Sequence, residues 1–393
     1  MKESVWTDEE GKTETVQNLI EKLFSYAMTR GVSDIHAEPL DETFRIRCRR
    51  DGVLQSVGAI RKEKGKAFIN RLKVMAALDI ADARRPQDGR IVYKEGIDMR
   101  LSTMPTVRGE KAVIRILGGS RNLPDLDSLG MDKRAVSLIR RSLRDAKGLI
   151  IICGPTGSGK TTTLHSLISA MDSESLKIIT IEDPVERVLP HIDQIQVNES
   201  IGLTFDGILR RVLRQDPDVI MVGEIRDTAT AELAVRASLT GHVILSTLHT
   251  NDSISAVTRL KNMGIEPYLV SSVLKYCVAQ RLVRKVCSSC GKTVPVNAEV
   301  KALQKKFGIK GTTMKEASGC AVCGYTGYAG RTVVSEIFEL TEDILRAIDG
   351  GDSEAKLYEI AAGEGMQRLS ENAVEKIIAG ETTLEEVKRE ALV

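Results

Sequence analysis

A glycine-rich loop between an apolar strand and a helix constrains this chain more than any other feature. The loop, Gly154-Pro155-Thr156-Gly157-Ser158-Gly159-Lys160-Thr161, follows the apolar run 149–153 and precedes a predicted helix over 162–171. This is the G-x-x-x-x-G-K-T spacing of a phosphate-binding loop, whose glycines bring backbone N–H groups close to phosphate. In such a loop the Lys160 amine reaches the β- and γ-phosphates and the Thr161 hydroxyl ligates Mg²⁺. We therefore expect the chain to bind a nucleoside triphosphate, and a chance match in a surface turn is the weaker alternative.

Composition narrows the class of protein. A chain of 393 residues with 42% apolar residues is long enough for two domains. The 56 Lys and Arg nearly balance the 54 Asp and Glu, so net charge does not favour nucleic acid or a membrane surface as a partner. No apolar run approaches the roughly 18 residues of a membrane-spanning helix, and the first ten residues are acidic rather than signal-like. We expect a cytoplasmic protein that reaches a membrane only through a partner.

The first part of the chain is predicted to form an α+β domain over 1–118, followed by a linker over 119–130. Apolar residues at helical spacing predict an amphipathic helix over 13–30, and the alternation over 43–49 with Asp51-Gly52 predicts a hairpin. The remaining predicted elements are the returning strand 53–57, a helix over 63–78, and strands over 89–93, 99–104 and 113–117.

The second domain is predicted to cover 131–393. Apolar strands alternate with helices, as expected of a mostly parallel sheet covered by helices on both faces. The domain is expected to include a metal-binding subdomain over 280–332 and a helical end over 340–393. The strands after the phosphate loop are expected over 177–181, 194–197, 219–222 and 242–248.

Acidic residues end two of these strands. Glu182 follows the strand over 178–181, and Glu224 follows the strand over 218–222. Open α/β sheets bind ligands at the carboxyl ends of their strands, so one of the acids Glu182, Asp183 and Glu186 could polarise the attacking water, and Glu224 could act on the metal-bound water. A solvated acidic turn remains the alternative for the cluster at Glu182.

Histidines and arginines supply further candidates. His242 and His249 share the strand over 242–248 and its end, although either could be an ordinary structural histidine. Guanidinium groups stabilise charge on a transferring phosphoryl group, sometimes across a subunit boundary, while a surface ion pair is the alternative for each single arginine. The candidate arginines are Arg100 and Arg115 in the first domain and Arg210, Arg211 and Arg214 in the second.

Two C-x-x-C pairs predict a structural zinc site. Cys287 and Cys290 form one pair, Cys320 and Cys323 form the other, and 29 residues separate the pairs. Four thiolates suit tetrahedral Zn²⁺, whereas a redox C-x-x-C would leave the second pair unexplained. Because the spacing exceeds the roughly 15–20 residues of a zinc ribbon, an inserted helix is expected around 298–307.

Taken in order, the motifs resemble those of the secretion ATPase superfamily, and within it the assembly ATPases of type II secretion and type IV pilus systems. The resemblance runs from about residue 14 to the C-terminus. It rests on SDIHAEP, RRPQDGR, GPTGSGKTT, IEDPVE, RQDPDVIMVGEIRD, TGHVILSTLHTND and the paired cysteines. In this family the segments 178–186 and 240–251 are called the Asp box and the His box.

The resemblance implies a RecA-like P-loop NTPase core with an N-terminal α+β (PAS-like) domain and a small zinc-binding insertion. It also implies a ring, usually hexameric, that hydrolyses ATP between the core and a neighbouring first domain. Assembly ATPases often carry an additional N-terminal domain, so a short form is expected here. In these terms the catalytic residues are Lys160, Glu182 as general base, Glu224 as the Walker B acid, Arg100 and Arg115. The nucleotide-binding residues are the loop 154–161, Thr162, His242, His249, Arg210, Arg214, Arg226 and Arg331.

The expected function is an ATPase motor, peripherally associated with the inner membrane, that assembles a pilus or pseudopilus through a platform protein. Its cofactors would be ATP, Mg²⁺ and Zn²⁺. The paired cysteines favour an assembly motor, because the pilus retraction ATPases generally lack them. A nucleic-acid-translocating P-loop motor is the alternative, but aromatic residues are only 4% of the chain and nucleic acid is not an expected partner. A nucleotide-gated scaffold is the third possibility, and the complete set of catalytic side chains argues against it.

Overall fold

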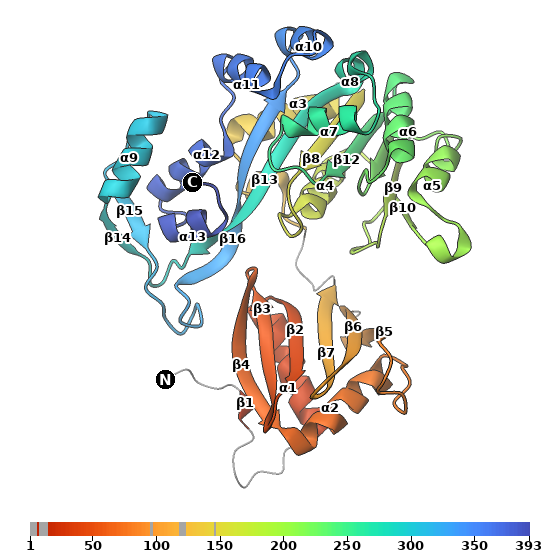
Figure 1. Cartoon of the computed structure of the whole chain (residues 1–393), viewed down its shortest axis with the longest axis vertical. Coiled ribbons are helices and arrows are strands. Elements are labelled where there is room, and N and C mark those ends of the chain that lie inside the picture. Colours follow the sequence, from red (N-terminus) through yellow and green to blue (C-terminus); the bar gives the residue numbers. More distant parts are fainter. Residues whose placement is uncertain (1–5, 8–14, 95–96, 118–122, 145–146) are drawn as a thin grey trace. The chain divides into compact units, whose positions relative to one another are not determined.

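The protein is described from a computed structural model, which covers residues 6–7, 15–94, 97–117, 123–144 and 147–393. The chain forms two compact units, Met1–Asn122 and Leu123–Val393. Each unit contains its own seven-stranded sheet (Figure 1). None of the helices in the described ranges combines the length and the apolar character that are needed to cross a lipid bilayer.

The first unit begins with the amphipathic helix that the sequence predicts. Thr15 caps it by accepting a hydrogen bond from the backbone N–H of Asn18 at 3.3 Å, and Gly31 ends it with φ +64°. The elements of the unit are β1 (Trp6–Thr7), α1 (Val16–Arg30), β2 (Val32–Pro39), β3 (Thr43–Arg50), β4 (Val53–Arg61), α2 (Lys62–Met75), β5 (Gln87–Tyr93), β6 (Ile97–Thr106) and β7 (Gly109–Leu117).

The sheet of the first unit has the order β1-β4-β3-β2-β7-β6-β5. The predicted hairpin is confirmed, since Asp51 and Gly52 both have positive φ and join β3 to β4. Strand β2, which contains the SDIHAEP motif, was not predicted, and it pairs antiparallel with both β3 and β7 in the middle of the sheet. The buried side chains of α1 and α2 pack against one face of the sheet, so the core of this unit lies between that face and the two helices.

The second unit begins at Leu123, and Leu126, inside the predicted linker, is buried in its core. Residues 118–122, which include the first four residues of the predicted linker, lie outside the described part of the chain. The elements are η2 (Leu126–Ser128), α3 (Lys133–Arg144), β8 (Gly148–Cys153), α4 (Lys160–Ser169), β9 (Ile178–Glu182), β10 (Asp193–Gln196), η3 (Glu199–Ile201), α5 (Phe205–Val212), β11 (Val219–Val222), α6 (Thr228–Leu239), β12 (Val243–Leu248), α7 (Ser255–Asn262), α8 (Pro267–Val273), β13 (Leu274–Val286), β14 (Lys292–Pro295), α9 (Ala298–Phe307), β15 (Thr313–Glu316), β16 (Tyr328–Glu339), α10 (Glu342–Asp349), α11 (Glu354–Gly363), α12 (Leu369–Ile378) and α13 (Leu384–Arg389).

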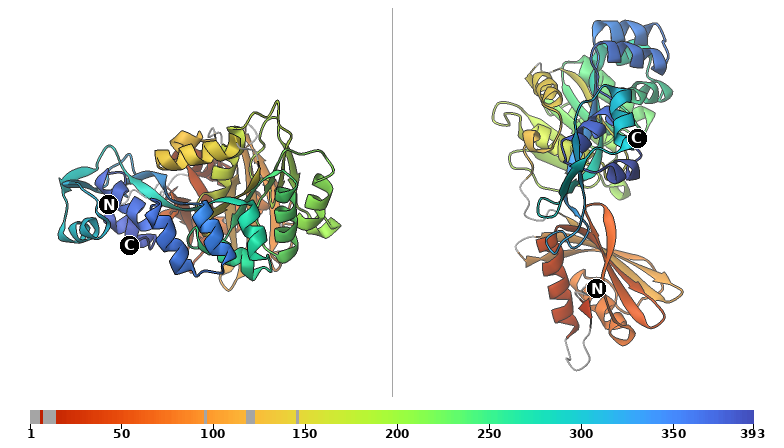
Figure 2. Two further views of the ribbon diagram at one scale, coloured as in Figure 1. Left: turned by 90° about the horizontal axis from the view of Figure 1, so that it is seen from above. Right: turned by 90° about the vertical axis from the view of Figure 1, so that its left-hand side faces the viewer.

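The sheet of the second unit has the order β10-β9-β11-β12-β8-β13-β16 and is parallel except for the antiparallel edge strand β16. Helices α3 and α4 cover one face, and α5, α6, α7 and α8 cover the other (Figure 2). All six residues of β8 are buried because both faces of the sheet are covered. The predicted parallel sheet between two helical layers is therefore confirmed.

A small subdomain follows β13. Strands β14 and β15 pair antiparallel, and α9 lies between them in the chain at the position where the sequence predicts an inserted helix. The four helices α10 to α13 form the C-terminal end, and α12 contacts both β16 and β15. The two C-x-x-C pairs flank this subdomain, one just after β13 and one just before β16.

Candidate active site

The phosphate-binding loop joins β8 to α4, and its backbone requires glycine. Gly157 and Gly159 have φ of +82° and +91°, in the left-handed region where side chains are strained. At Gly154 the limit is space, because a Cβ there would lie 2.5 Å from Ser158 Oγ and 2.7 Å from the Gln280 carbonyl oxygen. The loop can therefore expose its N–H groups to a phosphate without interference from side chains.

Lys160, the first residue of α4, points back into the loop. Its amine donates hydrogen bonds to the carbonyl oxygens of Gly154 at 2.8 Å and Pro155 at 3.1 Å. Burial lowers the pKa of the Lys160 amine, while the nearby carboxylate of Glu224 acts in the opposite direction. The amine thus lies within the loop where a bound phosphate chain would meet it.

Gln280 on β13 links the phosphate loop to the sheet, a role that was not predicted from the sequence. Its Nε2 donates to the Ser158 carbonyl oxygen at 2.7 Å, and its Oε1 accepts from Thr163 Oγ1 at 2.9 Å. The side chain is fully buried. A glutamine 122 residues after Ser158 has no local sequence signal for this role.

A cleft of about 520 Å³ opens beside the loop. Eleven of the predicted site residues line it. They are Thr156, Gly157, Gly159, Lys160, Thr161, Thr162, Glu182, Glu224, Arg226, His249 and Arg331.

Glu224 is the centre of a charged cluster in this cleft. Its carboxylate pairs with the Arg226 guanidinium, and its Oε2 lies 3.4 Å from His249 Nε2. Arg226 also lies 3.4 Å from the carboxylate of Asp183. The Glu224 side chain is only 19% exposed, so it faces Lys160 and the loop rather than solvent. The structure thus brings together the acid of β11, the histidine that follows β12 and the phosphate loop.

Glu182 and Glu186 both line the cleft but differ in their exposure to solvent. Glu182 is 2% exposed and accepts hydrogen bonds from His165 at 3.0 Å, Gln194 at 2.9 Å and Thr180. Burial raises the pKa of the Glu182 carboxyl, but these hydrogen bonds outweigh it and hold the pKa below its ordinary value. Glu186 is exposed and lines the same cleft. A general base needs access to water, and of these two cleft residues Glu186 is the more exposed to solvent.

Outside the phosphate loop, three predicted site residues of the second unit do not line the cleft. His242 precedes β12, at the opposite end of the strand from His249, and its Nδ1 lies 3.0 Å from the Ala237 carbonyl oxygen. Arg210 pairs with Asp206 at 3.6 Å on α5, and Arg214 donates to the Arg210 carbonyl oxygen at 2.9 Å. The structure does not bring these three side chains to the phosphate loop.

The two predicted arginines of the first unit, Arg100 and Arg115, form a row with Arg90 across three strands. Arg90, Arg100 and Arg115 are direct cross-strand neighbours on β5, β6 and β7. Arg115 Nε donates to Asp34 Oδ1 at 2.9 Å and Arg90 pairs with Asp98. Arg100 is exposed and has no ion pair within the described residues, so its guanidinium is available to another anion.

The four predicted cysteines come together as one cluster. Their Sγ atoms all lie within 4.8 Å of one another, and the closest pairs are 3.8–4.0 Å apart. Tetrahedral Zn²⁺ with Zn–S bonds of about 2.3 Å places sulfurs about 3.8 Å apart. Backbone N–H groups of Gly319, Cys320 and Gly327 also donate to Sγ atoms at 3.1–3.2 Å, as suits thiolates. The residues present fit a structural zinc ion.

Comparison with known proteins identifies the family. The profile of the family described as type II/IV secretion system protein matches residues 9–389. The chain belongs to this family. The chain is 44% identical over 377 residues to the type II secretion system protein HxcR of Pseudomonas aeruginosa, covering 95% of this chain and 77% of that protein.

Two further relatives of this secretion protein are named ATPases. The type II secretion system ATPase E of Vibrio cholerae is 42% identical, covering 94% of this chain and 74% of that protein. The type IV pilus assembly ATPase PilB of Thermus thermophilus is also 42% identical, covering 94% of this chain and 42% of PilB. The resemblance drawn from the motifs is therefore confirmed.

Solved structures agree on the fold of this secretion protein. The pilus retraction motor PilT with bound ADP matches with a TM-score of 0.64 and 26% identity, covering 94% of this chain and 96% of that one. The ATPase DotB of Legionella pneumophila matches with a TM-score of 0.70 at 18% identity, covering 97% of each chain, which bears on the fold alone. Family membership and the assembled cleft make this chain an ATP-binding hydrolase with a RecA-like core, as predicted.

Proposed function

We propose that this secretion ATPase is a cytoplasmic motor that assembles a type IV pilus or the pseudopilus of a type II secretion system. In this proposal the chain forms a homo-oligomeric ring, a hexamer, and acts on a platform protein of the inner membrane. The identities with HxcR and with the pilus assembly ATPase PilB support the choice of system. The four-cysteine cluster supports an assembly motor rather than a retraction motor.

One observation carries the catalytic part of the proposal. A single cleft contains Lys160 of the phosphate loop, Glu224 with its partners Arg226 and His249, and the exposed carboxylate of Glu186. Phosphoryl transfer to water needs groups that hold the phosphates, neutralise charge and orient the water. The cleft offers each of these groups from a different loop.

Within this cleft we assign the general base to Glu186 and a structural role to Glu182. Glu186 is exposed, whereas the Glu182 carboxylate is occupied by three hydrogen-bond donors. Replacing Glu186 with glutamine should reduce turnover roughly 100-fold or more and spare nucleotide affinity. Glu182→Gln serves as the comparison and should lower stability, because its carboxylate is buried. If Glu182→Gln alone abolished turnover in a stably folded protein, the assignment would be reversed.

Two metal ions belong to the proposal. Mg²⁺ would be held by the Thr161 hydroxyl together with the phosphates, near Glu224, and would supply charge neutralisation on the phosphates. Zn²⁺ would be held by the four cysteine thiolates and would stabilise the subdomain without taking part in hydrolysis.

Steady-state ATP hydrolysis with Mg²⁺ tests the proposal. We expect slow turnover by the wild type, a loss of at least about 100-fold in Lys160→Ala, and no change on addition of single- or double-stranded DNA. Lys177→Ala is the matched control, since it removes an exposed lysine of the same unit that pairs with Asp193. Strong stimulation by DNA would favour a nucleic-acid motor instead.

Arg100 and Arg115 are proposed to reach the phosphates from the first unit of the same or a neighbouring chain. Arg100 supports this role because its guanidinium is exposed and forms no ion pair within the described residues. Arg100→Ala should then spare ATP binding and reduce turnover about 1,000-fold, as expected for an arginine finger. Arg108→Ala removes the same charge at a hairpin tip, where Arg108 pairs with Asp41, and should have no such effect. Equal turnover in the two variants would refute the role of Arg100.

A further inference from the structure

The segment that follows β12 is anchored at its far end by the C-terminal helices. Glu336 on β16 is 3% exposed, and its Oε1 accepts hydrogen bonds from the backbone N–H of Ser253 at 3.0 Å and from the Ser253 hydroxyl. Its Oε2 accepts from the N–H of Leu369, the first residue of α12, at 3.2 Å. One buried carboxylate therefore joins the segment to the start of α12.

A second side chain approaches the same segment from α11. Tyr358 is partly buried beneath the Arg368 guanidinium, and its hydroxyl lies near the Asp252 carboxylate. Burial raises the pKa of this hydroxyl, and the Glu336 and Asp252 carboxylates add to the effect, so Tyr358 remains a donor. Asp252 also accepts from the N–H and hydroxyl of Ser255 at 2.8 and 2.7 Å, which fixes it at the start of α7.

His249 lies between two fixed points. On its near side, Thr247 Oγ1 donates to the Gly223 carbonyl oxygen at 2.8 Å, next to Glu224. On its far side, Ser253 is four residues away, a span of at most about 14 Å for extended chain. A shift of the far anchor therefore changes where the His249 imidazole lies relative to Glu224, 3.4 Å away.

A purely structural role does not explain why the buried residue at this position is a glutamate. Packing alone would be served by an apolar side chain, because burying a carboxylate costs desolvation free energy. A carboxylate does fix three N–H and O–H donors from two distant segments in defined directions. The arrangement holds a short active-site segment in one place relative to the C-terminal helices.

We propose that Glu336 and Tyr358 are positioning residues for ATP hydrolysis. They hold the His249 imidazole beside the Glu224 carboxylate, and they make turnover depend on the packing of α11 and α12. The proposal rests on the placement of His249 in the catalytic cleft. It makes the C-terminal helices part of the hydrolytic apparatus although none of their side chains lines the cleft.

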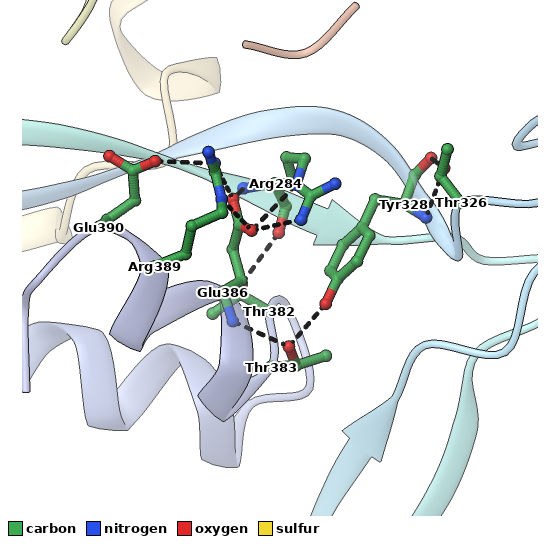
Figure 3. Close-up of polar contacts among 8 residues, drawn as sticks. All are labelled: Arg284, Thr326, Tyr328, Thr382, Thr383, Glu386, Arg389 and Glu390. Carbon is green, nitrogen blue, oxygen red and sulfur yellow. Dashed lines mark hydrogen bonds and ion pairs between the residues drawn. The ribbon is translucent and has the colours of Figure 1, made fainter. Parts of the chain in front are cut away.

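A matched pair of tyrosine variants tests the proposal. Tyr358 and Tyr328 are both partly buried in the second unit, and both lie under an arginine. Figure 3 shows the hydroxyl of Tyr328 directed at Thr383, with which it forms a hydrogen bond of 2.8 Å. Tyr358→Phe should lower kcat about three- to tenfold, whereas Tyr328→Phe should keep kcat within twofold of wild type. The affinity for a fluorescent ADP analogue should be unchanged in both variants.

A double-mutant cycle separates positioning from general destabilisation. Glu336→Gln replaces one acceptor oxygen by a donor, and we expect at least a tenfold lower kcat in the folded variant. In a His249→Ala background the same change should cost less than twofold, because the residue being positioned is absent. Glu386→Gln, which also alters a buried carboxylate of this unit, should keep the wild-type kcat in its folded fraction.

Two results would overturn the proposal: an equal kcat for Tyr358→Phe and Tyr328→Phe, or fully additive losses in the cycle of Glu336 and His249. Both results presuppose that the wild type hydrolyses ATP and that His249→Ala lowers kcat. If either condition is not met, the proposed function of the cleft is wrong. If both are met and one of the two results is found, only the positioning role of Glu336 and Tyr358 is wrong.

Discussion

Replacement of Glu386 by glutamine tests whether a buried ion network holds the last helix onto the sheet. The Glu386 side chain is inaccessible to solvent and accepts five hydrogen bonds, three from Arg284 on β13 and two from Arg389 on α13 (Figure 3). Arg284 also stacks on the Tyr328 ring, with 4.0 Å from its guanidinium carbon to the ring centroid. The network therefore joins α13 to β13 just before the first cysteine pair.

The magnitude follows from the pKa of this carboxyl. Burial raises the pKa of Glu386, but the hydrogen bonds from Arg389 and Arg284 outweigh it and lower the pKa from 4.5 to about 2. A carboxyl with a lowered pKa in the folded state contributes stability above its unfolded pKa and loses it as the pH falls toward its folded pKa. The contribution is about 3 kcal/mol at pH 7, and about 2 kcal/mol of this should be lost between pH 7 and pH 3.

Urea unfolding followed by circular dichroism measures this effect. Glu386→Gln should lower the free energy of unfolding of the second unit by about 3 kcal/mol at pH 7, and the difference from wild type should shrink to about 1 kcal/mol at pH 3. Glu385→Gln is the control, because it removes the same charge from an exposed position on the same helix. A difference that stays constant between pH 7 and pH 3 would refute the reasoning.

Three further perturbations address other parts of the chain. Lys73 Nζ lies 2.6 Å from Glu110 Oε1, and Lys73→Met leaves this buried carboxylate without its cation. The change should lower the free energy of unfolding of the first unit by about 3–5 kcal/mol. A shift in the unfolding transition of the second unit instead would contradict this. Gly130→Ala should cost about 2–4 kcal/mol, since φ is +85° and a Cβ would lie 2.1 Å from Thr332 Oγ1; an unchanged melting temperature would exclude the clash. Chelation should release about one Zn²⁺ per chain, measured by atomic emission, and increase hydrogen exchange over 287–323, whereas absence of zinc from the purified protein would end the zinc assignment.

Most elements of the fold were predictable because their signals are local. The caps at Thr15 and Gly31, the Asp51-Gly52 turn and the helix between the cysteine pairs all depend on a few neighbouring residues. Strand β2 was missed because the charged residues of SDIHAEP hide its alternation. Its even-numbered side chains Asp34, His36 and Glu38 lie beside arginines of the neighbouring strands, so the polar sequence is compatible with a central strand.

The candidate site was predictable in outline but not in the direction of its side chains. His242 and His249 lie at opposite ends of one strand, yet only the sheet determines which end faces the phosphate loop. Both Glu182 and Glu186 line the cleft, but Glu182 ends β9 with its side chain buried, whereas Glu186, four residues later, is exposed. In a parallel sheet covered on both faces, alternation of apolar residues does not reveal which acid points inward.

The sequence by itself determined the nucleotide class, the parallel core and the tetracysteine cluster, because loop spacing, strand pattern and C-x-x-C spacing act over short stretches of chain. Tertiary structure decided which groups surround the reacting phosphates. Gln280 contacts the loop from 122 residues away, and Glu336 holds Ser253 from 83 residues away. Hydrogen bonds of this kind leave no trace in local spacing, because a buried acceptor needs only a donor at the right distance, wherever in the chain that donor lies.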